Sequence, residues 1–419
     1  MFEVVRAVAA LRDEAETGHL GRIERLLDFV RDSGLYPPFH TVESRINEPE
    51  SVIEGRPYLM FGANNYLSLS EDEAVKAAAI RAISRYGIGP GGSRHMSGTV
   101  DIIVELERRL ADLTGMEACM TIPTGYMANV GVIRSLTCEF VGRMPYSDSE
   151  SVVFVDEYIH GSVSDGCRLA GVRTVRYRHN SLDDLERRLE QNRGYTNRVI
   201  VTEGVFCLEG EIIDIPEYVA LAREWDAMLL VDDAHAIGVL GPRGGGSPDY
   251  HDCADGIDLV VGSLDKALGG TGGYIAGSRT LIDYLWLTLR SNVLSSALPC
   301  GMAGAMLEVL DRVETATDIR AELASKAHWL RTTLRAEGFT VLGPHDIPSV
   351  PLFIGDEAEG IAFASGLLES GIYCPLMRWP AVPPGRCRFR LSIMARHEQR
   401  HLDALVEACV TVGRDLGII

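Results

Sequence analysis

The sequence predicts an α/β protein whose ligand site lies at the carboxyl edge of an open, mostly parallel sheet. Two short apolar runs, Met228 to Val231 and Ile257 to Val261, are rich in β-forming residues and bounded by turn formers, as buried strands are. They end near Asp232 and Lys266, which are 34 residues apart, about one strand-helix-strand unit. Ligands bind beyond such strand ends in open α/β sheets, so both residues are site candidates.

Lys266 is the first of these candidates, and a glycine-rich turn follows it. A lysine amine can form a Schiff base with a carbonyl, which is how enzymes hold pyridoxal 5'-phosphate (PLP). The glycines at 269, 270, 272 and 273 allow the backbone to approach a ligand closely or to adopt a positive φ. A surface lysine beside such a turn is common, so a second stretch must support the interpretation.

That second stretch is the Asp-x-x-His sequence that follows the upstream strand. PLP chemistry needs a carboxylate against the pyridine nitrogen, because the protonated ring is the electron sink for a carbanion. Asp232 can supply this carboxylate, and the spacing places His235 toward the same ligand. A strand-end aspartate alone is usually a helix cap. The two strand ends together favour a PLP enzyme.

Composition sets the limits for the other classes of function. With 419 residues, 46% of them hydrophobic, the chain can bury a large core and should form more than one domain. A net charge of −19 argues against nucleic acid or an anionic membrane as a partner. No apolar run approaches the ~20 residues of a membrane span, so we expect a cytoplasmic protein. Nine cysteines without a CxxC pair indicate reduced thiols.

From about Gly34 to the C-terminus, the order of motifs resembles that of the α-oxoamine synthases, a family of fold-type I PLP enzymes. Residues 34–70 look most like the serine palmitoyltransferase branch of that family. The resemblance implies an aspartate aminotransferase-like fold, with a mostly parallel seven-stranded sheet in a large domain and a smaller α+β C-terminal domain. The expected parts are an N-terminal arm and hairpin (1–59), a large PLP-binding domain (60–300) and a small domain (301–419).

The resemblance also assigns the groups that bind the cofactor's phosphate. A helix is expected to begin near Gly125, so the free amides of Gly125 and Tyr126 would face an anion. Ser263, three residues before the lysine, supplies a hydroxyl. Ser296 stands in a turn that in relatives reaches the phosphate of the other subunit. The resemblance therefore implies a homodimer with shared active sites.

Four further residues are implied to surround the cofactor ring. His160 matches the histidine that stacks flat on the pyridine ring, Asp232 keeps the pyridine nitrogen protonated, and His235 polarises the phenolic oxygen. Cys207 stands where relatives usually carry a serine that bonds the same oxygen, and a thiol is a weaker donor.

Three residues are implied to bind substrate. Asn64 matches a residue that lines the amino-acid site; its alternative role is that of a turn asparagine. Arg94 lies in a glycine-rich loop that the family places near the acyl-thioester entrance, from the neighbouring subunit. Arg390 matches the arginine that clamps the substrate carboxylate, a task that suits a guanidinium, and Arg388 is the nearby alternative.

The implied reaction is a decarboxylative Claisen condensation of a small α-amino acid (serine, glycine or alanine) with an acyl thioester of coenzyme A or acyl carrier protein. Lys266 would remove the Cα proton. Departures from the family pattern at Ile103, Cys207 and Gly245 favour a specialised pathway over ordinary sphingolipid synthesis. The alternatives are another fold-type I PLP enzyme, an aminotransferase or lyase, and a non-catalytic subunit of a heterodimeric synthase.

One further motif points to different chemistry. Residues 397–401 read HEQRH, which satisfies the HExxH zinc-protease pattern. No convincing third ligand follows in the remaining residues, so we expect no metal site. The GGTGG stretch lacks the GxGxxG order of a dinucleotide site.

The remaining elements follow from apolar periodicity and turn residues. The predictions are two helices within 1–35, a hairpin at 51–60, an amphipathic helix ending at Gly115, a long helical region at 303–337, and strands in VPLFIG, GIYCPL and RCRFRLSIMA.

Overall fold

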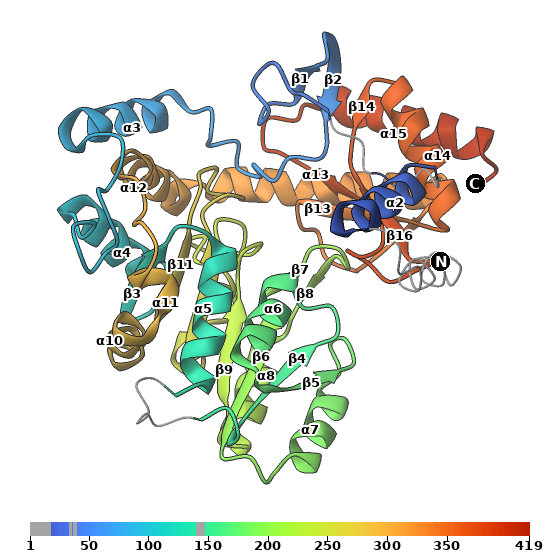
Figure 1. Cartoon of the computed structure of the whole chain (residues 1–419). Coiled ribbons are helices and arrows are strands. Elements are labelled where there is room, and N and C mark those ends of the chain that lie inside the picture. The colour runs from blue at the N-terminus through green and yellow to red at the C-terminus, as the bar shows by residue number, and fades with distance from the viewer. Residues whose placement is uncertain (1–17, 33–35, 37–39, 140–146) are drawn as a thin grey trace.

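The computed structural model of the chain describes residues 18–32, 36, 40–139 and 147–419 (Figure 1). Its central feature is a seven-stranded sheet in the order β3-β11-β10-β9-β6-β4-β5. Only β11 runs against its neighbours in this sheet, so the predicted mostly parallel, seven-stranded sheet is confirmed. The strands are β3 (Ala118–Ile122), β4 (Ser151–Asp156), β5 (Arg173–Tyr177), β6 (Asn197–Glu203), β9 (Met228–Asp232), β10 (Leu259–Ser263) and β11 (Gly273–Gly277).

Successive residues of each central strand point into two separate cores, one on each face of the sheet. In β9, Leu229 and Val231 belong to one buried cluster, whereas Leu230 belongs to the other. Both faces are therefore covered, which explains why these strands are continuous apolar runs rather than alternating ones. The covering helices are α4 (Asp101–Thr114), α7 (Leu182–Gln191) and α8 (Ile215–Glu224) on one face, and α5 (Gly125–Thr137), α6 (Gly161–Ala170) and α10 (Arg279–Thr288) on the other.

The helix boundaries agree with the local sequence. Helix α4 ends before Gly115, whose φ of 73° is the left-handed conformation that glycine adopts at helix ends. Helix α5 begins at Gly125, as predicted, and Thr124 caps it by accepting a hydrogen bond from the amide of Met127. Both β3 and β4 therefore lead into a helix whose N-terminus lies at the carboxyl edge of the sheet.

The N-terminal part of the described chain packs with the C-terminal part. The predicted hairpin is present as β1 (Glu50–Ile53) and β2 (Arg56–Met60), and β2 pairs with β14 (Ile372–Tyr373). Of the two predicted N-terminal helices, the second is α2 (His19–Asp32). The first falls within residues 1–17, outside the described residues. Helix α3 (Glu73–Tyr86) follows the hairpin.

The C-terminal part contains a four-stranded antiparallel sheet in the order β12-β13-β16-β15. The predicted long helical region is two helices, and GIYCPL is divided between β14 and β15, in different sheets. The boundaries at residues 60 and 300 remain our proposal for the domain division. The elements are α12 (Cys300–Thr315), α13 (Thr317–Ala336), β12 (Thr340–Val341), β13 (Ser349–Gly355), α14 (Glu357–Glu369), β15 (Leu376–Met377), β16 (Cys387–Ser392) and α15 (Gln399–Asp415).

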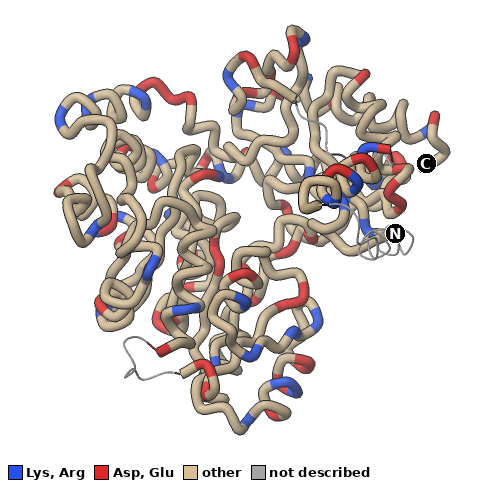
Figure 2. The backbone as a smooth tube through the Cα atoms, viewed as in Figure 1, with Lys and Arg blue, Asp and Glu red and all other residues tan. Residues whose placement is uncertain are grey.

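Short elements complete the described chain. They are β7 (Val205–Phe206) and β8 (Glu211–Ile212), which form a small hairpin, α9 (Ser247–His251), a 3-10 turn (Ala254–Gly256) and α11 (Arg290–Val293). Acidic and basic residues are interspersed over both the large-sheet part and the C-terminal part (Figure 2). Within the described residues, no helix combines the length and the apolar character that crossing a membrane requires.

Candidate active site

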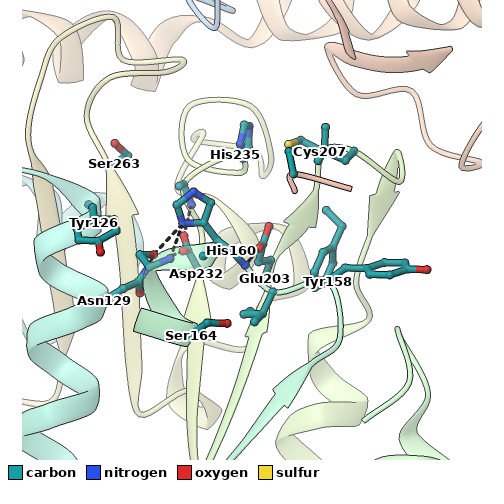
Figure 3. Close-up of a pocket in the computed structure, with 18 of the residues that line it drawn as sticks. Tyr126, Asn129, Tyr158, His160, Ser164, Glu203, Cys207, Asp232, His235 and Ser263 are labelled. Atoms are coloured by element: carbon teal, nitrogen blue, oxygen red, sulfur yellow. Dashed lines mark hydrogen bonds between the residues drawn. The ribbon is translucent and has the colours of Figure 1, made fainter. Parts of the chain in front are cut away.

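A cavity of about 910 Å³ lies at the carboxyl edge of the seven-stranded sheet (Figure 3). Its size is typical of a site for a cofactor with a substrate. The ends of β4, β6, β9 and β10 form one wall, and Met377, residues 379–384 and Arg390 contribute from the C-terminal part. Ten predicted site residues line it: Asn64, Gly125, Tyr126, His160, Cys207, Asp232, His235, Ser263, Lys266 and Arg390.

Lys266 lies in the turn between β10 and β11. Its side chain is 16% exposed, and its Nζ lies 3.3 Å from Asp265 Oδ1. The turn is closed by a hydrogen bond from the amide of Gly269 to the carbonyl of Lys266. Gly269 has a φ of 69°, and a Cβ there would lie 2.7 Å from the amide nitrogen of Ser70. Glycine at this position therefore allows the lysine turn to pack against the segment after Asn64.

Asp232 ends β9 and is buried. Its Oδ2 accepts a hydrogen bond from Asn129 Nδ2 (2.7 Å), and its Oδ1 accepts one from the amide of Ala234 (3.1 Å). Glu203 stands directly opposite on β6. Burial, together with the neighbouring Asp232, raises the pKa of Glu203 well above its ordinary value, which favours the neutral acid. The neutral form of Glu203 thus avoids a second negative charge beside Asp232 at this edge of the sheet.

His160 is the N-cap of α6, directly after β4. Its backbone amide donates to Glu203 Oε1 (2.8 Å), and its Nδ1 lies 2.7 Å from Ser162 Oγ. Ser162 is fully buried, and its Oγ accepts a hydrogen bond from Asn129 Nδ2 (3.0 Å). The capping interaction therefore fixes the orientation of the imidazole at the cavity surface.

His235 lies after β9, in contact with Tyr66. The Tyr66 hydroxyl is 2.9 Å from His235 Nδ1. Burial, with smaller effects from Lys266 and Arg390, lowers the pKa of His235 well below its ordinary value. Burial also raises the pKa of Tyr66. Both groups are therefore neutral at physiological pH, and this pair is a tyrosine-imidazole hydrogen bond rather than an ion pair.

Arg390, Asn64 and Cys207 form a third group. Arg390 Nη2 donates to Asn64 Oδ1 (2.8 Å), and its Nη1 contacts Cys207 Sγ (3.5 Å). Burial is the main effect that raises the pKa of the Cys207 thiol, so the thiol is neutral. Arg388, the alternative for the substrate carboxylate, is fully buried and donates to Leu208 O and to Glu209 Oε1 (2.9 Å). Of the two arginines, only Arg390 lines the cavity.

The N-terminus of α5 forms the opposite end of the cavity. Thr124 satisfies the amide of Met127, whereas the amides of Gly125 and Tyr126 belong to the first turn of the helix, where no carbonyl within the helix can accept from them. A Cβ on Gly125 would lie 3.5 Å from Ser263 Oγ, so the helix start and β10 end side by side. Backbone amides, a hydroxyl and a helix N-terminus are the donor set for a phosphate. In this structure the Ser263 hydroxyl donates to Asp265 Oδ1, so it would have to exchange that partner to bind a phosphate.

Two predicted site residues lie outside this cavity. Arg94 is buried, forms an ion pair with Glu107 (Nη2 to Oε2, 3.0 Å) and stacks on Trp286. Its guanidinium is thus occupied within its own chain, so in this structure it is not available at the cavity wall. Ser296 is exposed, and the prediction for it concerns the phosphate of a second subunit.

The departures from the family pattern have structural explanations. Ile103 is fully buried in the larger core cluster, where a histidine would need a polar partner. A Cβ on Gly245 would lie 2.2 Å from the carbonyl oxygen of Leu113. Arg243, two residues earlier, donates to that carbonyl (3.0 Å). The absence of an arginine at position 245 therefore follows from close backbone packing.

The HExxH pattern is the start of α15. His397 is fully buried, accepts from the amide of Met394 and lies 3.1 Å from the carbonyl of Met60. His401 accepts from the amide of Glu398, in a helix cap. The two imidazoles thus have local structural partners. The described residues contain no group of three or more potential metal ligands.

Sequence reasoning missed four residues that support the site: Tyr66, Asn129, Ser162 and Glu203. Asn129 had a detectable signal, because it lies four residues after Gly125 on the same face of a predicted helix. Glu203 ends β6 as Asp232 ends β9, so it carried the same strand-end signal. Tyr66 had none, because its relation to His235 depends on a contact between distant segments.

Comparison with known proteins gives one family and two groups of relatives. Residues 56–409 match the family described as aminotransferase class I and II. The chain is 40% identical to an 8-amino-7-oxononanoate synthase of Geobacter sulfurreducens, over 94% of this chain and 98% of that protein. It is 39% identical to a putative 8-amino-7-oxononanoate synthase of Acetivibrio thermocellus, over 93% of this chain and 97% of that protein.

The similar solved structures include serine palmitoyltransferases. One, from Sphingomonas wittichii, has a TM-score of 0.89 at 29% identity and covers 96% of this chain and 100% of that chain. Another, described as holding PLP as an internal aldimine, has a TM-score of 0.88 at 30% identity, with the same coverage.

Proposed function

This chain belongs to the aminotransferase class I and II family, in its α-oxoamine synthase branch, and from that premise we propose its reaction. It is a PLP-dependent acyltransferase with the fold-type I architecture. It condenses a small α-amino acid with an acyl thioester and releases carbon dioxide and the free thiol. The substrates named for its relatives support this reaction class.

The observation that carries the proposal is the set of groups around one cavity. A lysine amine, a buried carboxylate, an imidazole, a guanidinium and a helix N-terminus all face it. These groups fit PLP, because each functional part of that cofactor meets a chemically suited partner. When bound, PLP supplies the electron sink for carbanion chemistry at the substrate Cα.

The protein's own residues then have separate tasks. Lys266 Nζ holds the cofactor and afterwards accepts the proton from the substrate Cα. Asp232, which Asn129 orients, would accept a hydrogen bond from the pyridine nitrogen and keep that nitrogen protonated. His160 would cover the face of the ring and exclude water from it. The amides of Gly125 and Tyr126, with the Ser263 hydroxyl, bind the phosphate.

His235 is the donor to the phenolic oxygen of the cofactor. The hydroxyl of Tyr66 is buried, and His235 Nδ1 is its one partner among the described residues. The phenol must therefore donate to Nδ1, since its hydrogen would otherwise have no acceptor. The imidazole proton then lies on Nε2, where it can donate to the cofactor. Cys207 adds a weaker donor nearby.

Arg390 binds the carboxylate of the amino acid. Asn64 orients the guanidinium through Nη2, and Arg390 Nε is a buried donor without a partner among the described residues. A carboxylate could satisfy this donor. Serine, glycine and alanine are the candidate amino acids.

Several finer statements belong to the same proposal. The enzyme works as a cytoplasmic homodimer in which Ser296, and the loop of Arg94, serve the neighbouring subunit's site. Its acyl carrier is coenzyme A or acyl carrier protein. The residues at 103, 207 and 245 favour a specialised pathway, which predicts poor ketone formation from palmitoyl-CoA and serine.

The test is a visible-absorption titration of the purified protein loaded with PLP. Serine, glycine and alanine are added singly, and then an acyl thioester. We expect the cofactor band to shift with one amino acid and a new band to need the thioester. A protein that takes up no PLP would instead be a non-catalytic subunit. Amino transfer to a keto acid without thioester would indicate an aminotransferase.

A further inference from the structure

A continuous hydrogen-bond path connects Asp232 with the imidazole of His160 (Figure 3). Asn129 Nδ2 donates to Asp232 Oδ2 (2.7 Å) and to Ser162 Oγ (3.0 Å). Ser162 Oγ lies 2.7 Å from His160 Nδ1. Asn129 and Ser162 are both at least 97% buried, so water does not compete for these contacts.

The direction of each bond follows from the groups involved. Asp232 as a carboxylate can only accept, which places the Asn129 amide nitrogen toward it. The second hydrogen of that nitrogen goes to Ser162 Oγ, so the serine hydrogen is free to point to His160. The backbone amide of Ser162 also points at His160 Nδ1 (3.3 Å), and an amide N–H can only donate. Both contacts therefore require Nδ1 to be an acceptor.

An imidazole that accepts at Nδ1 carries its proton on Nε2. The ring of His160 is exposed at the cavity surface, and the described residues give Nε2 no hydrogen-bond partner. The free Nε2–H is thus the polar group that His160 offers to a ligand.

We propose that Ser162 is a positioning residue that fixes His160 as the Nε2–H tautomer. Asn129 couples this tautomer to Asp232 through its hydrogen bonds to Ser162 and Asp232. His160 then presents Nε2–H to the cavity. The proposal rests on the proposed function for the identity of the ligand that occupies the cavity, but the tautomer itself does not depend on turnover.

An energetically unfavourable group supports the hydrogen-bond path from Asp232 to His160, which we call the relay. The Oδ1 of Asn129 is buried and has no partner among the described residues. Leaving a buried acceptor unpaired is unfavourable, so an asparagine at this position lowers the stability of the fold unless its other contacts compensate. The two bonds made by Nδ2, to Asp232 and to Ser162, are the compensating gain.

The test reads the tautomer directly. The protein loaded with PLP is labelled with nitrogen-15 at histidine, and long-range proton-nitrogen correlation spectra at neutral pH distinguish Nδ1–H from Nε2–H. A His160→Gln variant assigns the His160 signals by their loss. We expect a protonated Nε2 and an unprotonated Nδ1 in the wild type.

Ser162→Ala removes the hydroxyl and leaves the weaker amide contact. The tautomer ratio should then shift on the order of threefold to tenfold toward Nδ1–H, the range for one neutral hydrogen bond. Ser162→Thr, which keeps a hydroxyl, should restore the wild-type signals if it folds. Ser164→Ala is the matched control, because this serine lines the same cavity but bonds Arg176.

A wild-type spectrum with Nδ1–H, or His160 signals that do not change in Ser162→Ala, would overturn the relay. Circular dichroism and cofactor uptake separate misfolding from this outcome. If the tautomer is as expected but no amino ketone forms, the proposed function fails and the relay stands. If the ketone forms with the other tautomer, the relay fails alone.

Discussion

At the scale of single residues, three of the polar side chains that line the cavity each have a hydrogen-bond partner behind them. Tyr66 lies behind His235, Ser162 behind His160, and Asn129 behind Asp232. The sequence could identify the residues that face the ligand, because they follow predicted strands. It could not identify Tyr66 behind His235, since Tyr66 comes from a distant segment, whereas Asn129 did carry a signal through its helical spacing from Gly125.

Tyr66→Phe tests this arrangement at His235. The variant removes the one donor to His235 Nδ1 among the described residues, so the tautomer is no longer fixed and the hydrogen bond to the cofactor weakens. We expect kcat to fall on the order of threefold to tenfold, with a shifted cofactor absorption band. The matched control is Tyr274→Phe, because Tyr274 is equally buried and its hydroxyl has no partner among the described residues. Equal effects of the two substitutions would contradict the role given to Tyr66.

Lys266→Ala tests the assigned base. With Nζ removed, no described residue can replace both the covalent attachment and the proton transfer, so turnover should be lost while the fold persists. The measurement is steady-state release of free thiol, with mass spectrometry to confirm that PLP is no longer attached. Sustained amino ketone formation by this variant would show that another group is the base.

At the scale of elements, the predictions succeeded where one short segment decides the outcome and failed where two segments must meet. The start of α5 at Gly125 and the end of α4 before Gly115 depend on local caps, and both were predicted. The division of GIYCPL between β14 and β15 was not, because β14 pairs with the N-terminal hairpin. Partner choice of this kind is a long-range property.

His179 shows how elements are joined by charge. It follows β5 and contacts Asp156 at the end of β4 (2.9 Å) and Glu211 in β8 (3.6 Å). Burial by itself would lower its pKa, but the electrostatic interactions with these two carboxylates prevail and raise the pKa of His179 to about 10. This pKa lies above the ordinary value of about 6.5, so folding favours the protonated form.

The resulting stabilisation should be complete below about pH 6.5 and should be lost progressively as the pH rises to about 10. We therefore expect the difference in Tm between the wild type and His179→Gln to be large at pH 6 and to shrink toward pH 10. Thermal unfolding followed by circular dichroism at a series of pH values measures it. A difference that stays constant with pH would show that the charge of His179 contributes nothing.

At the scale of the whole molecule, the sheet, the cofactor class and most cavity residues could be predicted from the sequence. Strand-end residues such as Asp232 and Lys266 mark the edge where parallel strands end together. The sequence could not show that Arg94 pairs with Glu107 within its own chain, and the role of its loop at the neighbouring subunit's site stays a prediction. Residues proposed to act across subunits are likewise beyond the reach of a single chain.

The proposed shared site can be tested by mixing two inactive variants. Ser296→Glu places a negative charge where the partner's phosphate is proposed to bind, and Lys266→Ala lacks the base. In a mixed dimer, one site has Lys266 from one chain and Ser296 from the other, so activity should reappear after the subunits are exchanged. If each chain builds its own site, no mixture recovers activity.

The central claim is that loss of carbon dioxide and transfer of the acyl group belong to one reaction. The most direct measurement supplies an amino acid labelled with carbon-13 at its carboxyl group together with an acyl thioester, and counts labelled carbon dioxide and free thiol released per turnover. The account predicts equal amounts of both, and neither product when the amino acid or the thioester is omitted. Amino-group transfer with no release of thiol, or thiol release with the label retained in the product, would contradict it.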